Sequence, residues 1–166
     1  MAGTVGQGVL FVRVRPGNLE KAMREITKNK DVERAEPLFG RYDLVVTGAF
    51  KDLEGLQRFS EEIRSKEFCE SCAAHPTFDQ WTREERTEMP WNAWTLVKAQ
   101  NLEAVRTKLR QIAAVNRVYS TAGEHELIVR LSAERPEALQ EAVLKQLQKV
   151  EGVRRTETLP TLRTEG

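Results

Sequence analysis

Residues 38–47 read LFGRYDLVVT, and residues 121–130 read TAGEHELIVR. In both stretches a glycine is followed by any residue, an aromatic residue or histidine, an acid and three aliphatic residues. The second copy lies 83 positions after the first. A short pattern that returns far along a chain is typical of a duplicated structural unit.

Other stretches repeat at the same offset. Residues 18–20 and residues 101–103 both read Asn-Leu-Glu, and after a one-residue slip residues 76–77 and 160–161 both read Pro-Thr. These identities keep their order and agree with the hydrophobic period. We therefore interpret the chain as one unit present twice.

Each half predicts the order strand, helix, strand, strand, helix, strand. The expected strands are 9–15, 32–39, 42–50 and 68–75, then 93–99, 115–122, 125–132 and 152–159. Asn18 and Asn101 are expected N-caps of the first helix of each half. Gly40 and Gly123 lie in tight reversals between the second and third strands, where positive φ is often needed.

This order is that of the split βαβ, or ferredoxin-like, unit, so the predicted class is α+β with two such units in tandem. The expected domains are residues 1–78 and 91–166, joined by a charged linker at 79–90. The strands are apolar on both sides, which indicates that the second face of each sheet is buried too. The simplest way to bury it is to pair the two sheets face to face.

Composition narrows the class of function. The 166 residues include 26 Lys plus Arg against 25 Asp plus Glu, so the net charge is +1. Direct nucleic-acid binding is not expected, because it usually needs a basic excess or stripe. No stretch is apolar enough to span a membrane, no secretory signal is visible, and two cysteines are too few for a secreted disulfide scaffold. We therefore expect a cytoplasmic protein that does not contact membranes.

The runs PGNLEKAMREI (16–26) and FGRYDLVVTG (39–48) resemble the ligand-binding domain of the leucine-responsive/asparagine regulator (Lrp/AsnC) family, also called RAM. The resemblance covers residues 8–78 well and residues 91–162 more loosely. It implies a dimeric α/β barrel, here made covalent by fusion. It also implies small effectors, typically amino acids, bound between units beside the glycine loop, and further association into a homo-oligomer, such as a dimer of fused units.

Family members usually carry a helix-turn-helix that reads DNA before this domain. About seven residues precede the first expected strand, so we expect no such reader here. The second half also departs from the family pattern, because it reads Gly-Glu-His-Glu at 123–126 and lacks the Pro-Gly pair before its first helix.

The first candidate site is Gly40, Arg41, Tyr42 and Asp43. Asp43 could accept a ligand ammonium, while Arg41 or freed backbone N–H groups could hold a carboxylate. The alternative is a purely structural turn, in which the tyrosine packs and the acid caps or pairs.

The second candidate site is Gly123, His125 and Glu126, the corresponding positions in the other half. His125 could titrate near neutrality. A multi-histidine metal site cannot be built from one copy, because His75 is the one other histidine in the sequence. Neither a metal nor another cofactor is therefore expected.

Cys69 and Cys72 form a Cys-x-x-Cys pair. Residues three apart in an extended strand point to opposite faces, so we expect structural cysteines rather than a redox or metal pair. The cluster of Trp81, Trp91 and Trp94 either lines a pocket or anchors the linker.

No catalytic set can be argued from the spacing of residues. The leading hypothesis is therefore a non-enzymatic regulatory or sensor module that binds a small metabolite, a partner protein, or both. One alternative is a small α/β-barrel monooxygenase, isomerase or haem-dependent enzyme using His75, His125, Tyr42 or Tyr119. The other is a pure interaction scaffold.

Overall fold

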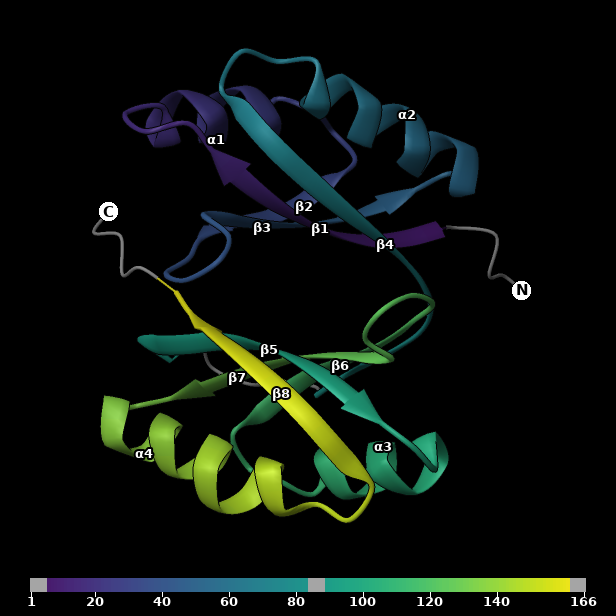
Figure 1. Cartoon of the computed structure of the whole chain (residues 1–166), viewed down its shortest axis with the longest axis vertical. Helices are drawn as coiled ribbons and strands as arrows, with labels where there is room; N and C mark the ends of the chain where they lie inside the picture. Colours follow the sequence, from purple (N-terminus) through teal and green to yellow (C-terminus); the bar gives the residue numbers. More distant parts are fainter. Residues whose placement is uncertain (1–5, 84–88, 162–166) are drawn as a thin grey trace. The chain divides into compact units, whose positions relative to one another are not determined.

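The computed structural model describes residues 6–83 and 89–161. The chain divides into two compact units, Met1–Phe78 and Asp79–Gly166 (Figure 1). No helix among the described residues is long and apolar enough to cross a membrane.

The first unit has the order β-α-β-β-α-β. Its elements are β1 (Gly6–Val14), α1 (Leu19–Thr27), β2 (Val32–Pro37), β3 (Leu44–Phe50), α2 (Leu53–Arg64) and β4 (Cys69–Thr82), the last of which runs on into the second unit. The strand order in the sheet is β2-β3-β1-β4, and the β1–β3, β1–β4 and β2–β3 pairs are antiparallel. Both helices cover one face of this sheet (Figure 1).

The second unit repeats this order with one irregular helix. Its elements are β5 (Trp91–Ala99), α3 (Leu102–Arg110), β6 (Val115–Thr121), β7 (Leu127–Ala133), α4 (Pro136–Glu141) with its π and 3-10 continuations (Ala142–Gln146 and Leu147–Lys149), and β8 (Val153–Pro160). The strand order is β6-β7-β5-β8, with the end of β4 next to β6. The residues from 79 to 82, part of the predicted linker, are thus strand, and residues 84–88 lie outside the described part.

Each unit has its own core between helices and sheet. Alternate strand residues such as Leu10 and Val12 of β1 pack with Ile26 of α1 and Phe59 of α2. In the second unit the same alternation brings Val97 into the helix-side core. The element order and the strand order confirm the α+β class and the two tandem ferredoxin-like units. The sequence could predict this fold because the hydrophobic period decides which face of each strand meets the helices.

The expected N-cap positions are confirmed, because Asn18 immediately precedes α1 and Asn101 immediately precedes α3. Neither Asn18 nor Asn101 makes a side-chain cap hydrogen bond. Asn18 donates to the carbonyl oxygen of Pro16 instead, at 3.1 Å. Asn101 adopts a left-handed conformation with φ of 56°. It thereby takes over the bend that Gly17, with φ of 84°, makes before the equivalent helix of the first unit.

The expected facing of the cysteines was wrong. Cys69 pairs with Val14 and Cys72 with Val12, because a β-bulge shifts the register between Arg13 and Val14. The extra residue brings both thiols into the same helix-side core. The bulge, which the sequence pattern does not show, therefore reverses the simple argument from strand alternation.

Candidate functional site

The two glycine turns adopt similar conformations. Gly40 has φ of 115° and Gly123 has φ of 142°, a region that favours glycine. In the first turn the N–H of Leu38 donates to the carbonyl oxygen of Asp43 at 2.8 Å. In the second, the N–H of Thr121 donates to that of Glu126 at 2.9 Å.

The acids of the two predicted sites hold the ends of neighbouring strands. The N–H of Val14, the last residue of β1, donates to Oδ2 of Asp43 at 2.8 Å. The N–H of Ala99, the last residue of β5, donates to Oε1 of Glu126, also at 2.8 Å. One oxygen of each carboxylate therefore has a structural role, as the alternative interpretation requires. The ligand-binding role assigned to these turns stays a prediction.

The other loop residues of the first unit lie against aromatic rings. The guanidinium carbon of Arg41 lies 4.8 Å from the ring centroid of Tyr42. The Tyr42 ring lies 5.3 Å from that of Phe11, which also meets His75 edge to face at 5.6 Å. The structure therefore brings Tyr42 and His75 together around Phe11, on the sheet face away from the helices.

His125, the counterpart of Tyr42, is 5% exposed. Its carbonyl oxygen accepts a hydrogen bond of 2.7 Å from the hydroxyl of Thr121. Among the described residues, no group of three or more His, Cys, Asp or Glu side chains could hold a metal ion. The hydrogen bonds from Thr121 to His125 and Glu126 therefore hold the backbone of this turn.

A polar cluster that the sequence analysis missed lies on the second face of the second unit's sheet, which is the face away from its helices. Arg117 of β6 pairs in register with Arg130 of β7, and Arg130 pairs with Trp94 of β5. The guanidinium carbon of Arg130 lies 5.9 Å from the Trp94 ring, which stacks on Tyr119. We call Arg117, Arg130, Trp94 and Tyr119 the arginine cluster.

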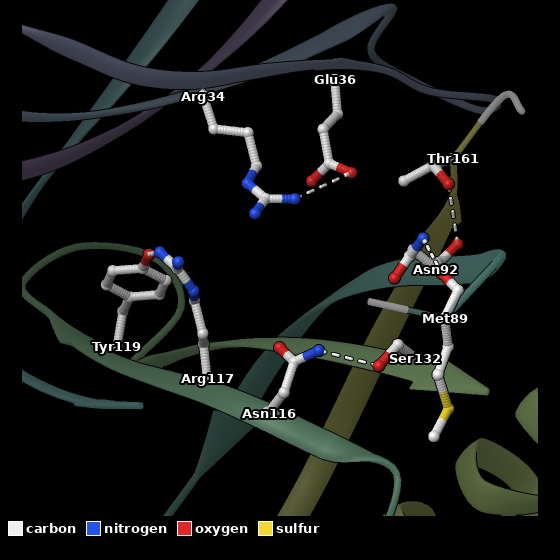
Figure 2. Close-up of polar contacts among 9 residues, drawn as sticks. All are labelled: Arg34, Glu36, Met89, Asn92, Asn116, Arg117, Tyr119, Ser132 and Thr161. Carbon is white, nitrogen blue, oxygen red and sulfur yellow. Dashed lines mark hydrogen bonds and ion pairs between the residues drawn. The ribbon is translucent and has the colours of Figure 1, made fainter. Parts of the chain in front are cut away.

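Trp94, Tyr119 and Arg130 of the cluster are buried, and Arg117 is partly buried. Arg130 is 2% exposed and Tyr119 is 1% exposed. Arg117 Nη1 donates to the Tyr119 hydroxyl at 3.0 Å, and Figure 2 shows the two side chains side by side. The signal in the sequence was a charged residue, Arg130, inside the aliphatic run of β7.

The first unit differs at the corresponding positions. Arg34 there forms an ion pair with Glu36 at 3.8 Å (Figure 2). Thr47 of β3, paired in register with Arg34, stands where the second unit has Arg130. The first unit therefore balances its arginine with an acid, whereas the second unit places a second arginine beside the first.

The two thiols are protected by burial. Burial raises the pKa of the Cys72 thiol to about 12, against a smaller opposing effect of Arg64. Burial likewise raises the pKa of Cys69. Because the thiolate is the reactive form, these cysteines are poor nucleophiles and metal ligands at neutral pH.

The three tryptophans do not form one cluster. Trp81 and Trp91 pack against the helix-side core of the second unit, whereas Trp94 lies on the other face. Arg83, whose guanidinium carbon lies 5.0 Å from the Trp81 ring, donates to the carbonyl oxygens of Val115, Arg110 and Ile112. Trp81 and Arg83 therefore anchor the start of the second unit.

Comparison with known proteins gives the family. The model of the Lrp/AsnC ligand-binding domain matches residues 7–86 and again residues 95–165. No curated protein sequence matches the chain.

Two solved structures resemble the fold. The siroheme decarboxylase NirDL shares 11% identity at a TM-score of 0.72, over 96% of this chain and 72% of that one. A mutant chlorite dismutase from Candidatus Nitrospira defluvii shares 14% identity at a TM-score of 0.63, over 99% of this chain and 93% of that one. At such identities the similarity concerns the fold alone. With both halves matched by the family model, this chain belongs to the Lrp/AsnC ligand-binding domain family, as a tandem pair of such domains.

Proposed function

We propose that the chain is a non-enzymatic regulatory module whose second unit binds a small metabolite carrying a carboxylate, of the amino-acid type. Membership of a ligand-binding family supports the general role. The observation that carries the specific proposal is the arginine cluster, in which Arg117 and Arg130 are cross-strand neighbours beside Trp94.

The chemistry of the cluster suits a carboxylate. A guanidinium offers five N–H donors in a planar fork that matches a carboxylate, so two arginines side by side present two such forks. Placing two like charges opposite each other on a sheet is unfavourable. An anion between or beside them offsets this repulsion, as does any other anionic group that reaches them.

The non-enzymatic part of the proposal rests on the state of the reactive groups. Both thiols are held protonated by burial. Asp43 and Glu126 accept hydrogen bonds from strand-end backbone N–H groups. The thiols thus serve packing, and the carboxylates hold strand ends. The regulatory signal would be carried by a protein partner or by a homo-oligomer.

The test is a thermal-shift screen with the twenty amino acids at millimolar concentration, on wild type, Arg130→Gln and Asp43→Ala. Binding to the folded state raises the melting temperature by mass action. The proposal expects a stabilising amino acid whose effect is lost in Arg130→Gln and kept in Asp43→Ala. Loss in Asp43→Ala alone would place the site at the glycine turn instead, and no response in wild type would contradict ligand binding.

An enzymatic role is the rival hypothesis. One structure of similar fold is named a siroheme decarboxylase, and His75 lies beside Phe11 on the second face of the first unit's sheet. A haem titration distinguishes the two hypotheses. A saturable shift of the haem absorption band that disappears in His75→Ala would favour the enzyme.

A further inference from the structure

A row of polar side chains crosses the second face of the second unit's sheet, one step along the strands from the arginine cluster. It consists of Asn116 of β6, Ser132 of β7 and Asn92 of β5. Asn116 Nδ2 donates to the Ser132 hydroxyl at 2.9 Å, and Asn92 and Ser132 are paired in register. Figure 2 shows the three side chains following one another across the sheet. We call these residues the amide row.

Two oxygens of the amide row are buried without a partner. Oδ1 of Asn116 and Oδ1 of Asn92 are shielded from solvent and accept no hydrogen bond from the described residues. Asn116 itself is only 9% exposed. A buried polar atom without a partner is costly, so native structures rarely keep one unless a ligand, an ion or water completes it.

The orientation of Asn92 is fixed by its neighbours. Its Nδ2 donates to the carbonyl oxygen of Met89 at 3.1 Å, so the other side-chain atom, the free one, must be the oxygen. Its backbone carbonyl oxygen accepts two hydrogen bonds from Thr161, one from N–H at 2.9 Å and one from the hydroxyl at 3.1 Å. The acceptor is thus held on a rigid strand rather than on a loop.

The first unit serves as an internal comparison. The positions of Asn92 and Ser132 are occupied there by Val9 and Ala49, at the same offset of 83 that relates the two glycine turns. Apolar residues therefore satisfy the fold at these two places. Polar residues in the second unit need another explanation than packing, because an apolar side chain of similar size avoids the unpaired oxygen.

The position of Asn116 supports a functional explanation. It lies where the β6–β7 pairing shifts register, between Val115 and Arg117. Such a bulge re-aims a side chain and is frequent next to binding sites. The first unit keeps the same shift, between Val32 and Arg34, but has Glu33 there.

We infer that the amide row is the subsite for the ammonium group of a zwitterionic amino acid whose carboxylate is bound by the arginine cluster. This inference rests on the proposed function and names the second half of its site. Three acceptors, Asn92 Oδ1, Asn116 Oδ1 and Ser132 Oγ, match the three N–H donors of a primary ammonium. The row and the cluster are two residues apart along β5 and β7, about 7 Å, which long arginine side chains span.

The arrangement predicts selectivity. The cross-strand pair next to Asn92 and Ser132 on this face is Trp94 and Arg130. The positive charge of Arg130 therefore opposes the binding of a simple amine. A carboxylate without an ammonium leaves the amide oxygens unpaired. A ligand with both groups satisfies both sets of residues, and it binds more tightly than either fragment.

The experiment uses the full chain and two variants that copy the first unit, Asn92→Val and Ser132→Ala. The probes are the twenty L-amino acids, their N-acetyl derivatives, methylammonium chloride and potassium chloride, followed by thermal shift and calorimetric titration. In wild type we expect an amino acid to bind at least about tenfold more tightly than its N-acetyl derivative, which lacks the ammonium. Neither methylammonium nor potassium should raise the melting temperature beyond a sodium chloride control.

In Asn92→Val we expect the preference for the free ammonium to disappear, while the melting temperature without ligand stays the same or rises. In wild type the side-chain amide resonances of Asn92 and Asn116 should shift when the amino acid is added. An amino acid that binds wild type and Asn92→Val equally would overturn the inference and leave the proposed function standing. Stabilisation by potassium alone would also overturn it, because the row would then be an inorganic cation site. No response to any amino acid would contradict the inference and the proposed function together.

Discussion

Asp43 and Glu126, 83 positions apart, make the same hydrogen bond in their two units. Each carboxylate accepts the backbone N–H of the last residue of its unit's first strand, at 2.8 Å in both cases. The acid of the repeated motif is therefore a device that fixes the strand end next to the glycine turn. The backbone donor is Val14 in the first unit and Ala99 in the second.

This relationship predicts the effect of removing the acid. Asp43→Ala should lower the free energy of unfolding by about 1–3 kcal/mol, because the N–H of Val14 loses a charged acceptor in a partly buried place. Asp43→Asn keeps an acceptor oxygen and should lose clearly less. Urea denaturation measures both. Equal stability of Asp43→Ala and wild type would show that the bond is not needed, and Glu124→Gln, an exposed neighbour of the second turn, serves as the surface control.

Two glycines with positive φ offer a matched pair. A Cβ at Gly152, where φ is 102°, would come within 2.7 Å of both the Gln100 carbonyl oxygen and Val105 Cγ2. A Cβ at Gly17, where φ is 84°, would meet nothing within 4 Å. Gly152→Ala should therefore cost more than about 2 kcal/mol, and Gly17→Ala about 1 kcal/mol from backbone strain alone. Similar losses in thermal denaturation would contradict the close approach at Gly152.

Arg83 links the start of the second unit to the end of α3 through three carbonyl oxygens, at 2.9 to 3.0 Å. Arg83→Ala should destabilise this unit by about 2 kcal/mol, because charged hydrogen bonds to backbone are lost at a helix C-terminus. Arg83→Lys keeps the charge but lacks the fork and should recover only part of the loss. Hydrogen exchange should speed up around residues 110–115 in both variants. Unchanged exchange there would contradict the anchoring role.

The Cys72 thiol predicts a dependence on alkaline pH. Burial raises its pKa from an ordinary value of 9.0 to about 12, so between these values the unfolded chain loses a proton that the folded chain keeps. Stability conferred by this group is complete below pH 9 and falls above it, by at most about 1.4 kcal/mol per pH unit. The alkaline slope of the free energy of unfolding should be smaller in Cys72→Ala than in wild type. Native wild type should also react slowly with a thiol reagent at pH 8, and identical slopes or fast labelling would contradict this account.

Much of the fold could be predicted from the sequence because hydrophobic period and the duplicated turn act locally. The order of strands and helices, the positive φ at Gly40 and Gly123, and the two units all follow from such patterns. The facing of Cys69 could not be predicted in this way, because a bulge depends on how two distant strands pair. Likewise the left-handed Asn101 reflects the bend that the chain needs where no glycine is present.

The candidate site was harder to predict than the fold. The glycine turns are short local motifs that the sequence shows directly, and they were therefore predicted as sites. Their acids, however, accept hydrogen bonds from backbone N–H groups at strand ends. Arg117, Arg130 and Trp94 come from three strands and become neighbours only through the register of the sheet. The available signal was the presence of isolated polar residues, such as Arg130 and Ser132, inside aliphatic strands. Because the chain is duplicated, these residues can be compared with Thr47 and Ala49 at the equivalent positions of the first unit.

The most direct test of the central claim is calorimetric titration of wild type and Arg130→Gln with the amino acid that gives the largest thermal shift. The account predicts saturable binding to wild type and a loss of at least about tenfold in affinity for Arg130→Gln, since a charged hydrogen-bonding partner of the carboxylate is removed. Equal affinity in the two proteins would contradict the assignment of the carboxylate to the second unit's sheet face.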